Sequence, residues 1–157
     1  MTEPFVRLGT AEDMEAVMGL MKLATEENAF IKPSTPKIAI ATWGCLTRQN
    51  ALAGIATLDG IGVHGCIMLT IGENIYSEER FLQEQIVFVH PDCRSMKYAL
   101  GKRLVNFGKH AADELGMPLL IGVLSNKRTA GKTRMYERLI GPPAGAFFLY
   151  GAETGLP

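Results

Sequence analysis

Cysteine is scarce in this sequence, which limits the metal and redox chemistry that it supports. Its three cysteines are Cys45, Cys66 and Cys93, and they form neither a CxxC motif nor any other metal-ligand spacing. Isolated cysteines of this kind are typical of reduced thiols in a cytoplasmic protein. We therefore predict no disulfide framework, no metal site and a cytoplasmic location.

An excess of one charge and long apolar runs are also missing. The 16 Lys and Arg residues balance 16 Asp and Glu residues, so the net charge is zero, which argues against a general nucleic-acid-binding protein. No apolar run approaches the ~20 residues that cross a membrane, and the first nine residues lack the pattern of a signal peptide. With 157 residues, a single domain over 1–157 is expected.

The most informative stretch covers residues 81–104. Residues 85–89 are mostly β-branched or aromatic and predict a buried strand, which Pro91 ends because it has no N–H to donate. From Ala99 onward, apolar residues recur at spacings of three and four, which predicts a helix. Arg94 and Lys97 lie in the turn before it, where free backbone N–H groups and the helix dipole favour a phosphate. The alternative is a solvated basic surface.

The first half of the chain predicts a short strand at 5–8, a helix from Met14 to about residue 27, and a second helix over about 36–48. Trp43, the only tryptophan, is expected to be a buried anchor between that second helix and a sheet. Three strands then follow at 52–58, 62–71 and 81–90, joined first by the turn signal Asp59-Gly60 and then by a polar excursion.

The second half predicts a strand–helix–strand unit. The helix ends at Gly116, and the apolar run 119–124 is expected to be a strand buried on both faces and parallel to residues 86–89. A helix carrying Ala130 to Leu139 and a last strand at 146–150 complete the chain. If exposed, that last strand pairs across a possible homodimer.

Residues 89–104, VHPDCRSMKYALGKRL, resemble motif A of the GCN5-related N-acetyltransferases (GNAT superfamily). Arg94 and Ala99 match positions of the motif, and Lys97 stands where the family usually has glycine. Farther on, Asn126, Ala130, Tyr136 and Gly141 occur in the family's order. Among known variants, the sequence is most similar to short bacterial or phage-type members.

The resemblance implies a fold and a donor substrate. The fold is α/β (α+β): a mixed, mostly antiparallel twisted sheet with a central parallel βαβ unit splayed in a V, and helices on both faces. The donor is acetyl-CoA, with no metal. The implied cofactor-binding residues lie on the strand, the turn and the last helix, and are Val87, Phe88, Val89, Arg94, Ser95, Met96, Lys97, Tyr98, Ala99, Asn126 and Lys132.

The resemblance also implies direct attack of a primary amine on the thioester in a ternary complex. Tyr136 is the candidate general acid, by its position. Glu84, His90 or a chain of water molecules are the candidates for the base. Strand alternation predicts that only one of Glu84 and Gln85 faces the cleft.

The acceptor is expected to be a small-molecule amine or a protein amine. Phe30, Ile31 and Lys32 are candidates for contact with it, by resemblance. The acidic residues within 73–79 favour a cationic acceptor, although a solvated hairpin loop explains them equally well. The rival reading of the whole chain is a non-catalytic acyl-CoA-binding or protein-interaction module on the same fold.

Overall fold

The core of the molecule is a mixed β-sheet. The computed structural model describes residues 3–28, 32–123 and 128–151. Within them the five strands lie in the order of the chain: β1 (Phe5–Leu8), β2 (Ala51–Thr57), β3 (Gly65–Glu73), β4 (Arg80–Val89) and β5 (Leu119–Leu120). The first four pair antiparallel, and β5 pairs parallel to β4. The predicted mixed sheet with a parallel βαβ pair is confirmed, and that pair forms one edge of the described sheet.

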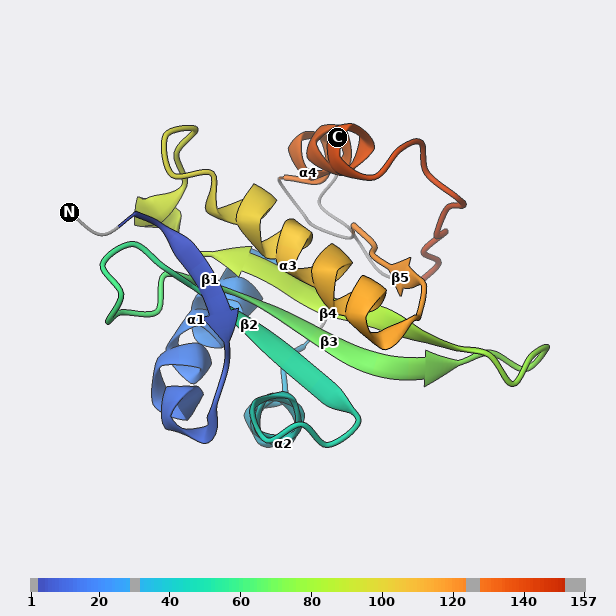
Figure 1. Ribbon diagram of the computed structural model, residues 1–157, viewed down its shortest axis with the longest axis horizontal. Coiled ribbons are helices and arrows are strands. Elements are labelled where there is room, and N and C mark those ends of the chain that lie inside the picture. The colour runs from blue at the N-terminus through green and yellow to red at the C-terminus, as the bar shows by residue number, and fades with distance from the viewer. Residues whose placement is uncertain (1–2, 29–31, 124–127, 152–157) are drawn as a thin grey trace.

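Helices cover both faces of this sheet (Figure 1). On one face, α1 (Met14–Glu27) and α2 (Thr35–Leu46) bury residues such as Val17 and Leu46 against Ile55. On the other face, α3 (Leu100–Leu115) buries Leu100 and Leu104 against strand residues of the second core cluster. The last helix, α4 (Thr129–Leu139), lies beside α3. None of the described helices is long and apolar enough to cross a membrane.

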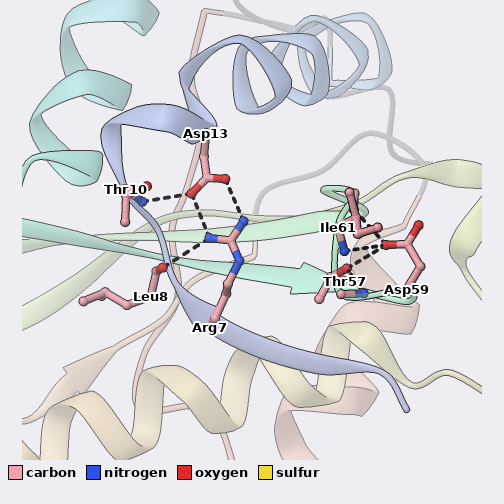
Figure 2. Close-up of polar contacts among 9 residues, drawn as sticks. Arg7, Leu8, Thr10, Asp13, Thr57, Asp59 and Ile61 are labelled. Carbon is pink, nitrogen blue, oxygen red and sulfur yellow. Dashed lines mark hydrogen bonds and ion pairs between the residues drawn. The ribbon is translucent and has the colours of Figure 1, made fainter. Parts of the chain in front are cut away.

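The entry into α1 is fixed by an ion pair with β1 (Figure 2). The two Arg7 nitrogens Nη1 and Nη2 donate to the Asp13 carboxylate at 2.8 and 2.7 Å, and the Thr10 N–H donates to it at 2.9 Å. The Asp13 carboxylate is almost fully buried, so these bonds replace its lost hydration. The Arg7 guanidinium accordingly lowers the pKa of Asp13. This pair positions α1 against the edge strand.

Other helix ends follow from local chemistry. The Ser34 hydroxyl accepts a hydrogen bond from the Lys37 N–H at the start of α2, as an N-cap does. Gly116 ends α3 with a φ of 64°, a left-handed conformation that glycine adopts without steric cost. The helix α3 ends as predicted at Gly116, and α2 begins within one residue of its predicted start.

Three predictions of local structure are wrong. Trp43 is not a buried anchor but 45% exposed, because α2 packs through the face that carries Thr42, Cys45 and Leu46. Of the strand predicted at 119–124, the described residues 119–123 form strand only at Leu119–Leu120, and this edge strand leaves Leu120 45% exposed. Residues 146–150 form no strand, and their aromatic side chains are exposed. The strand that would pair across a homodimer is therefore missing from the described chain.

Candidate functional site

The site begins where β4 and β5 part. Among the described residues, the two parallel strands pair only at Leu82 with Leu119 and at Gln83 with Leu120. Beyond these pairs, β4 continues to Val89 while β5 stops, so the sheet edge opens as the predicted V requires. Two cavities lie on either side of this opening.

A bulge in β4 lies beside the opening. Glu84 pairs with Leu69 and Ile86 pairs with Met68, so Gln85 is an extra residue in β4. Glu84, Gln85 and Ile86 all line one cavity. Glu84 pairs with Leu69 of the core cluster on the α3 side, whereas the Gln85 amide donates to the hydroxyl of Thr70, the next residue of β3, at 2.8 Å, so the Glu84 and Gln85 side chains leave β4 on opposite faces, as predicted.

The first cavity, here called the α3 cavity, has a volume of about 720 Å³ and lies between the start of α3, the end of β4 and α4. Among the residues described, five basic side chains and no acidic one line it: Arg94, Lys102, Arg128, Lys132 and Arg138. Burial and the neighbouring Arg94 guanidinium lower the pKa of Arg128. Crowded cations of this kind favour an anionic ligand that neutralises them.

The turn before α3 presents backbone donors to this cavity. The first bond that enters the helix runs from the Arg103 N–H to the Ala99 carbonyl at 3.0 Å, so the N–H groups of residues 100–102 precede it. Ala99 has a φ of 50° and no side-chain cap covers the helix start. Lys97, at the position where glycine is usual in the resembled motif, is not among the described residues with positive φ. The left-handed conformation falls on Ala99 instead.

Arg94 is held by three contacts within the protein. Its Nη2 donates to the Glu27 carboxylate at 2.8 Å, its Nε donates to the Val89 carbonyl at 2.9 Å, and its guanidinium lies over the Phe88 ring at 5.1 Å. These contacts fix the guanidinium at the wall of the α3 cavity. They also connect the end of α1 with the turn after β4.

The second cavity, here called the α2 cavity, has a volume of about 660 Å³ and lies between α1, α2, β4 and the segment after β5. Its wall is largely apolar and includes Met21, Ile38, Ile86 and Ile121. A cavity of this size is in the range that binds small-molecule ligands, about 300–1,000 Å³.

The two cavities meet at one place. Val87, Lys132 and Tyr136 line both of them. The Lys132 ammonium donates to the Val87 carbonyl at 3.4 Å, and the Gly122 N–H donates to the Glu84 carboxylate at 3.3 Å. A carboxyl, an ammonium and a phenol therefore gather where a ligand in one cavity meets a ligand in the other.

Burial changes the protonation of all three groups. It raises the pKa of Glu84 to about 7, although the Gly122 N–H and the Lys132 charge act in the opposite direction. It lowers the pKa of Lys132, and it raises the pKa of Tyr136, with the Glu84 charge adding to that rise. At neutral pH, Glu84 is poised to exchange a proton and Tyr136 keeps its own.

The predicted site residues fall into three groups. Val87, Phe88, Val89, Arg94, Ser95, Met96, Ala99 and Lys132 line the α3 cavity, Tyr136 lies at the junction, and Glu84 lines the α2 cavity. Lys97, Tyr98 and His90 line neither cavity. The His90 Nδ1 instead accepts a hydrogen bond from the Asp92 N–H at 3.1 Å. Asn126, Phe30 and Ile31 lie outside the described residues, whereas Lys32 lines the α2 cavity.

Sequence reasoning named Lys132 and Tyr136 on α4 but missed other residues of this region that line the α3 cavity, namely Arg128, Met135, Arg138 and Leu139. Arg128, Lys132, Met135 and Leu139 recur at spacings of three and four and all line the α3 cavity. The signal was present as a cluster of basic residues at 127–138. Its periodicity becomes readable only when the helix is known to begin at Thr129.

Known structures resemble this one over nearly their whole length. A possible acetyltransferase from Clostridium difficile 630 aligns with a TM-score of 0.73 and 17% identity, over 97% of this chain and 98% of that one. A ribosomal-protein-alanine N-acetyltransferase from Brucella melitensis biovar Abortus 2308 aligns with a TM-score of 0.70 and 17% identity, over 94% and 97%. The aminoglycoside N-acetyltransferase AAC(6')-Iy, in complex with CoA, aligns with a TM-score of 0.72 and 17% identity, over 96% and 95%.

Likeness at this level of identity establishes the fold. No protein-family model and no curated protein sequence matches this chain. The activity therefore has to be argued from the chain's own residues.

Proposed function

Because the chain has the fold of the GCN5-related N-acetyltransferases (GNAT superfamily), we propose that it transfers an acetyl group from acetyl-CoA to a primary amine. The observation that carries the proposal is the junction of two cavities at Val87, Lys132 and Tyr136. Transfer between two substrates requires that their reacting atoms meet. The α3 cavity has the charge of a site for a phosphorylated donor, and the α2 cavity has the size and apolar wall of a site for a small acceptor.

The donor binds in the α3 cavity. Its pyrophosphate lies against the backbone N–H groups at the start of α3, with Arg128 and Lys102 supplying positive charge. Its pantetheine arm follows the exposed backbone of β4 at Val87, Phe88 and Val89, beyond the point where β5 stops pairing. This course brings the thioester to the junction.

The acceptor amine attacks the thioester carbonyl carbon from the α2 cavity. Glu84 takes the proton that the amine must lose, directly or through a water molecule, and its pKa of about 7 suits a base at neutral pH. As the carbon–sulfur bond breaks, the CoA thiolate receives a proton from the Tyr136 hydroxyl, which its raised pKa keeps protonated. His90, which lines neither cavity, is the less favoured base.

The proposal is tested by thiol release. The purified protein is mixed with acetyl-CoA and a panel of primary amines, and free CoA is followed with a thiol reagent. Amine-dependent release that Glu84→Gln reduces supports the proposal, and Glu137→Gln, an exposed carboxylate on α4, serves as the matched control. Binding of CoA without release by any amine, small or on a peptide, would instead favour the non-catalytic acyl-CoA-binding module.

A further inference from the structure

Most of the charged side chains that line the α2 cavity are positive, although the acidic residues within 73–79 favoured a cationic acceptor. Among the residues described, Lys32, Lys37 and Lys132 line this cavity, and Glu84 is the one carboxylate that does. A cavity built for a polycationic acceptor needs several carboxylates, because each unpaired positive charge that enters has to be balanced. In the α2 cavity, lysines instead outnumber carboxylates among the described lining residues.

The three lysines do not lie equivalently. Lys132 is half-buried at the junction with the α3 cavity, together with Glu84, where the reacting amine is expected. Lys32 and Lys37 are exposed, belong to the segment leading into α2 and its first turn, and line the α2 cavity alone. Their charges therefore act on the part of the acceptor that is remote from the reacting amine.

Lys32 and Lys37 carry unneutralised charge. Within the described ranges, no carboxylate forms an ion pair with either ammonium group. They also do not line the α3 cavity, so they are not part of the set that receives the phosphorylated donor. The rest of the α2 cavity wall is largely apolar, with Ile38 and Ile121 among its residues.

The acidic residues that favoured a cationic acceptor lie elsewhere. Glu73, Glu78 and Glu79 belong to the hairpin between β3 and β4, which projects away from the helices (Figure 1). No residue of that hairpin tip lines the α2 cavity. Their charge is on the solvated loop, and it does not set the charge of the acceptor site.

We infer that the acceptor is an amine that also carries a carboxylate or another anionic group, separated from the reacting nitrogen by an apolar segment. This inference rests on the proposed function and adds the substrate class. The reacting amine lies at Glu84, the apolar segment contacts the wall, and the anion lies at Lys32 and Lys37. A dicationic amine of the same length places its second ammonium beside two lysines and is disfavoured.

Three acceptors of matched length test this assignment: 6-aminohexanoate, 1-aminohexane and 1,6-diaminohexane. Their amines have pKa values close to that of a lysine side chain, about 10.4, so the neutral fraction of the nucleophile is nearly constant. We expect kcat/KM for 6-aminohexanoate to exceed that for 1,6-diaminohexane by roughly 10-fold or more, with 1-aminohexane between them. The preference falls as the salt concentration rises, since the two lysines are exposed.

Charge reversal at the cavity provides the second arm. Lys37→Glu is expected to abolish or reverse the preference, while Lys22→Glu, an exposed lysine of α1 that does not line the cavity, leaves it unchanged. A preference for 1,6-diaminohexane in the wild-type protein, or no change in Lys37→Glu, would overturn the acceptor class and leave the transferase intact.

A third arm separates failure of the acceptor class from failure of the proposed function. If none of the three amines is acetylated, binding of 6-aminohexanoate and 1,6-diaminohexane to the CoA-saturated protein is measured by calorimetry. Tighter binding of the carboxylate supports the assignment of the cavity. Equal binding, tighter binding of the diamine, or no binding of either overturns it.

Discussion

Arg94 and Glu27 form an ion pair of 2.8 Å between the turn after β4 and the last residue of α1. The pair places a carboxylate beside the α3 cavity, whose charged lining residues, among those described, are all basic. The Glu27 charge also acts on Arg128 and on Lys132. A polyanionic donor therefore competes with Glu27 for the same positive charge.

Removing this carboxylate is expected to strengthen donor binding. Glu27→Gln keeps the shape of the side chain and deletes its charge, so the affinity for CoA should rise by roughly 2- to 10-fold at low salt. Calorimetric titration with CoA measures the change. Glu26→Gln, one residue earlier on α1, is the control for a change in net charge, and a weaker affinity in Glu27→Gln would contradict the competition.

Activity should depend on the ionisation of Glu84. If its carboxylate is the base, kcat/KM rises with pH through about 7, the pKa that burial gives it. In Glu84→Gln this limb disappears and the rate falls by about 100-fold or more. A wild-type profile without inflection between pH 6 and 8 would remove Glu84 as the base.

The same carboxyl changes stability in a defined direction. The folded protein binds the Glu84 proton more tightly than the unfolded chain does, because burial raises the pKa from 4.5 to about 7. Its stabilising contribution is complete below pH 4.5 and is lost as the pH rises through about 7. Relative to wild type, Glu84→Gln should gain about 1–3 kcal/mol in the free energy of unfolding between pH 5 and pH 8. Urea denaturation of both proteins at pH 5 and pH 8 measures this gain. The same difference in free energy of unfolding between variant and wild type at both pH values would contradict the raised pKa of Glu84.

Tyr136 is expected to act on the chemical step and not on donor binding. Tyr136→Phe removes the hydroxyl and keeps the buried ring, so kcat should fall by about 100-fold while the Kd for acetyl-CoA stays within about twofold. Tyr98→Phe is the matched control, because Tyr98 lines neither cavity. An unchanged kcat in Tyr136→Phe would leave its ring with a packing role alone.

The backbone at Ala99 is strained. A residue with a Cβ at a φ of 50° destabilises the folded state by roughly 1–2 kcal/mol compared with glycine. Glycine offsets part of this advantage, because it has more conformational entropy to lose when the chain folds. Ala99→Gly should therefore raise the free energy of unfolding by up to about 1 kcal/mol. Ala39→Gly, within α2, should lower it by about 1 kcal/mol. Thermal unfolding of the two variants measures these changes. A loss of stability in Ala99→Gly equal to the loss in Ala39→Gly would show that the backbone at Ala99 is not strained.

The sequence predicted the elements that carry the donor site because their signals are local. Pro91, Gly116 and the spacing of Leu100 and Leu104 fixed the end of β4 and the extent of α3. It did not predict the bulge at Gln85, because a single inserted residue leaves the composition of the strand unchanged.

Contacts between distant segments were beyond prediction for a different reason. Glu27 and Arg94 are 67 residues apart, and no local pattern connects them. The face by which α2 packs depends on the sheet beneath it, which is why Trp43 was assigned to the core and lies largely outside it. The short β5 likewise reflects its place at the sheet edge more than its apolar composition.

The most direct test of the account is a calorimetric titration of the protein with acetyl-CoA. If the α3 cavity is the donor site, one molecule binds per chain with micromolar affinity, and Arg128→Glu, which replaces a cation of that cavity, weakens binding by about 10-fold or more. Wild-type protein that binds neither acetyl-CoA nor CoA at millimolar concentration would contradict the account and leave the fold without its donor.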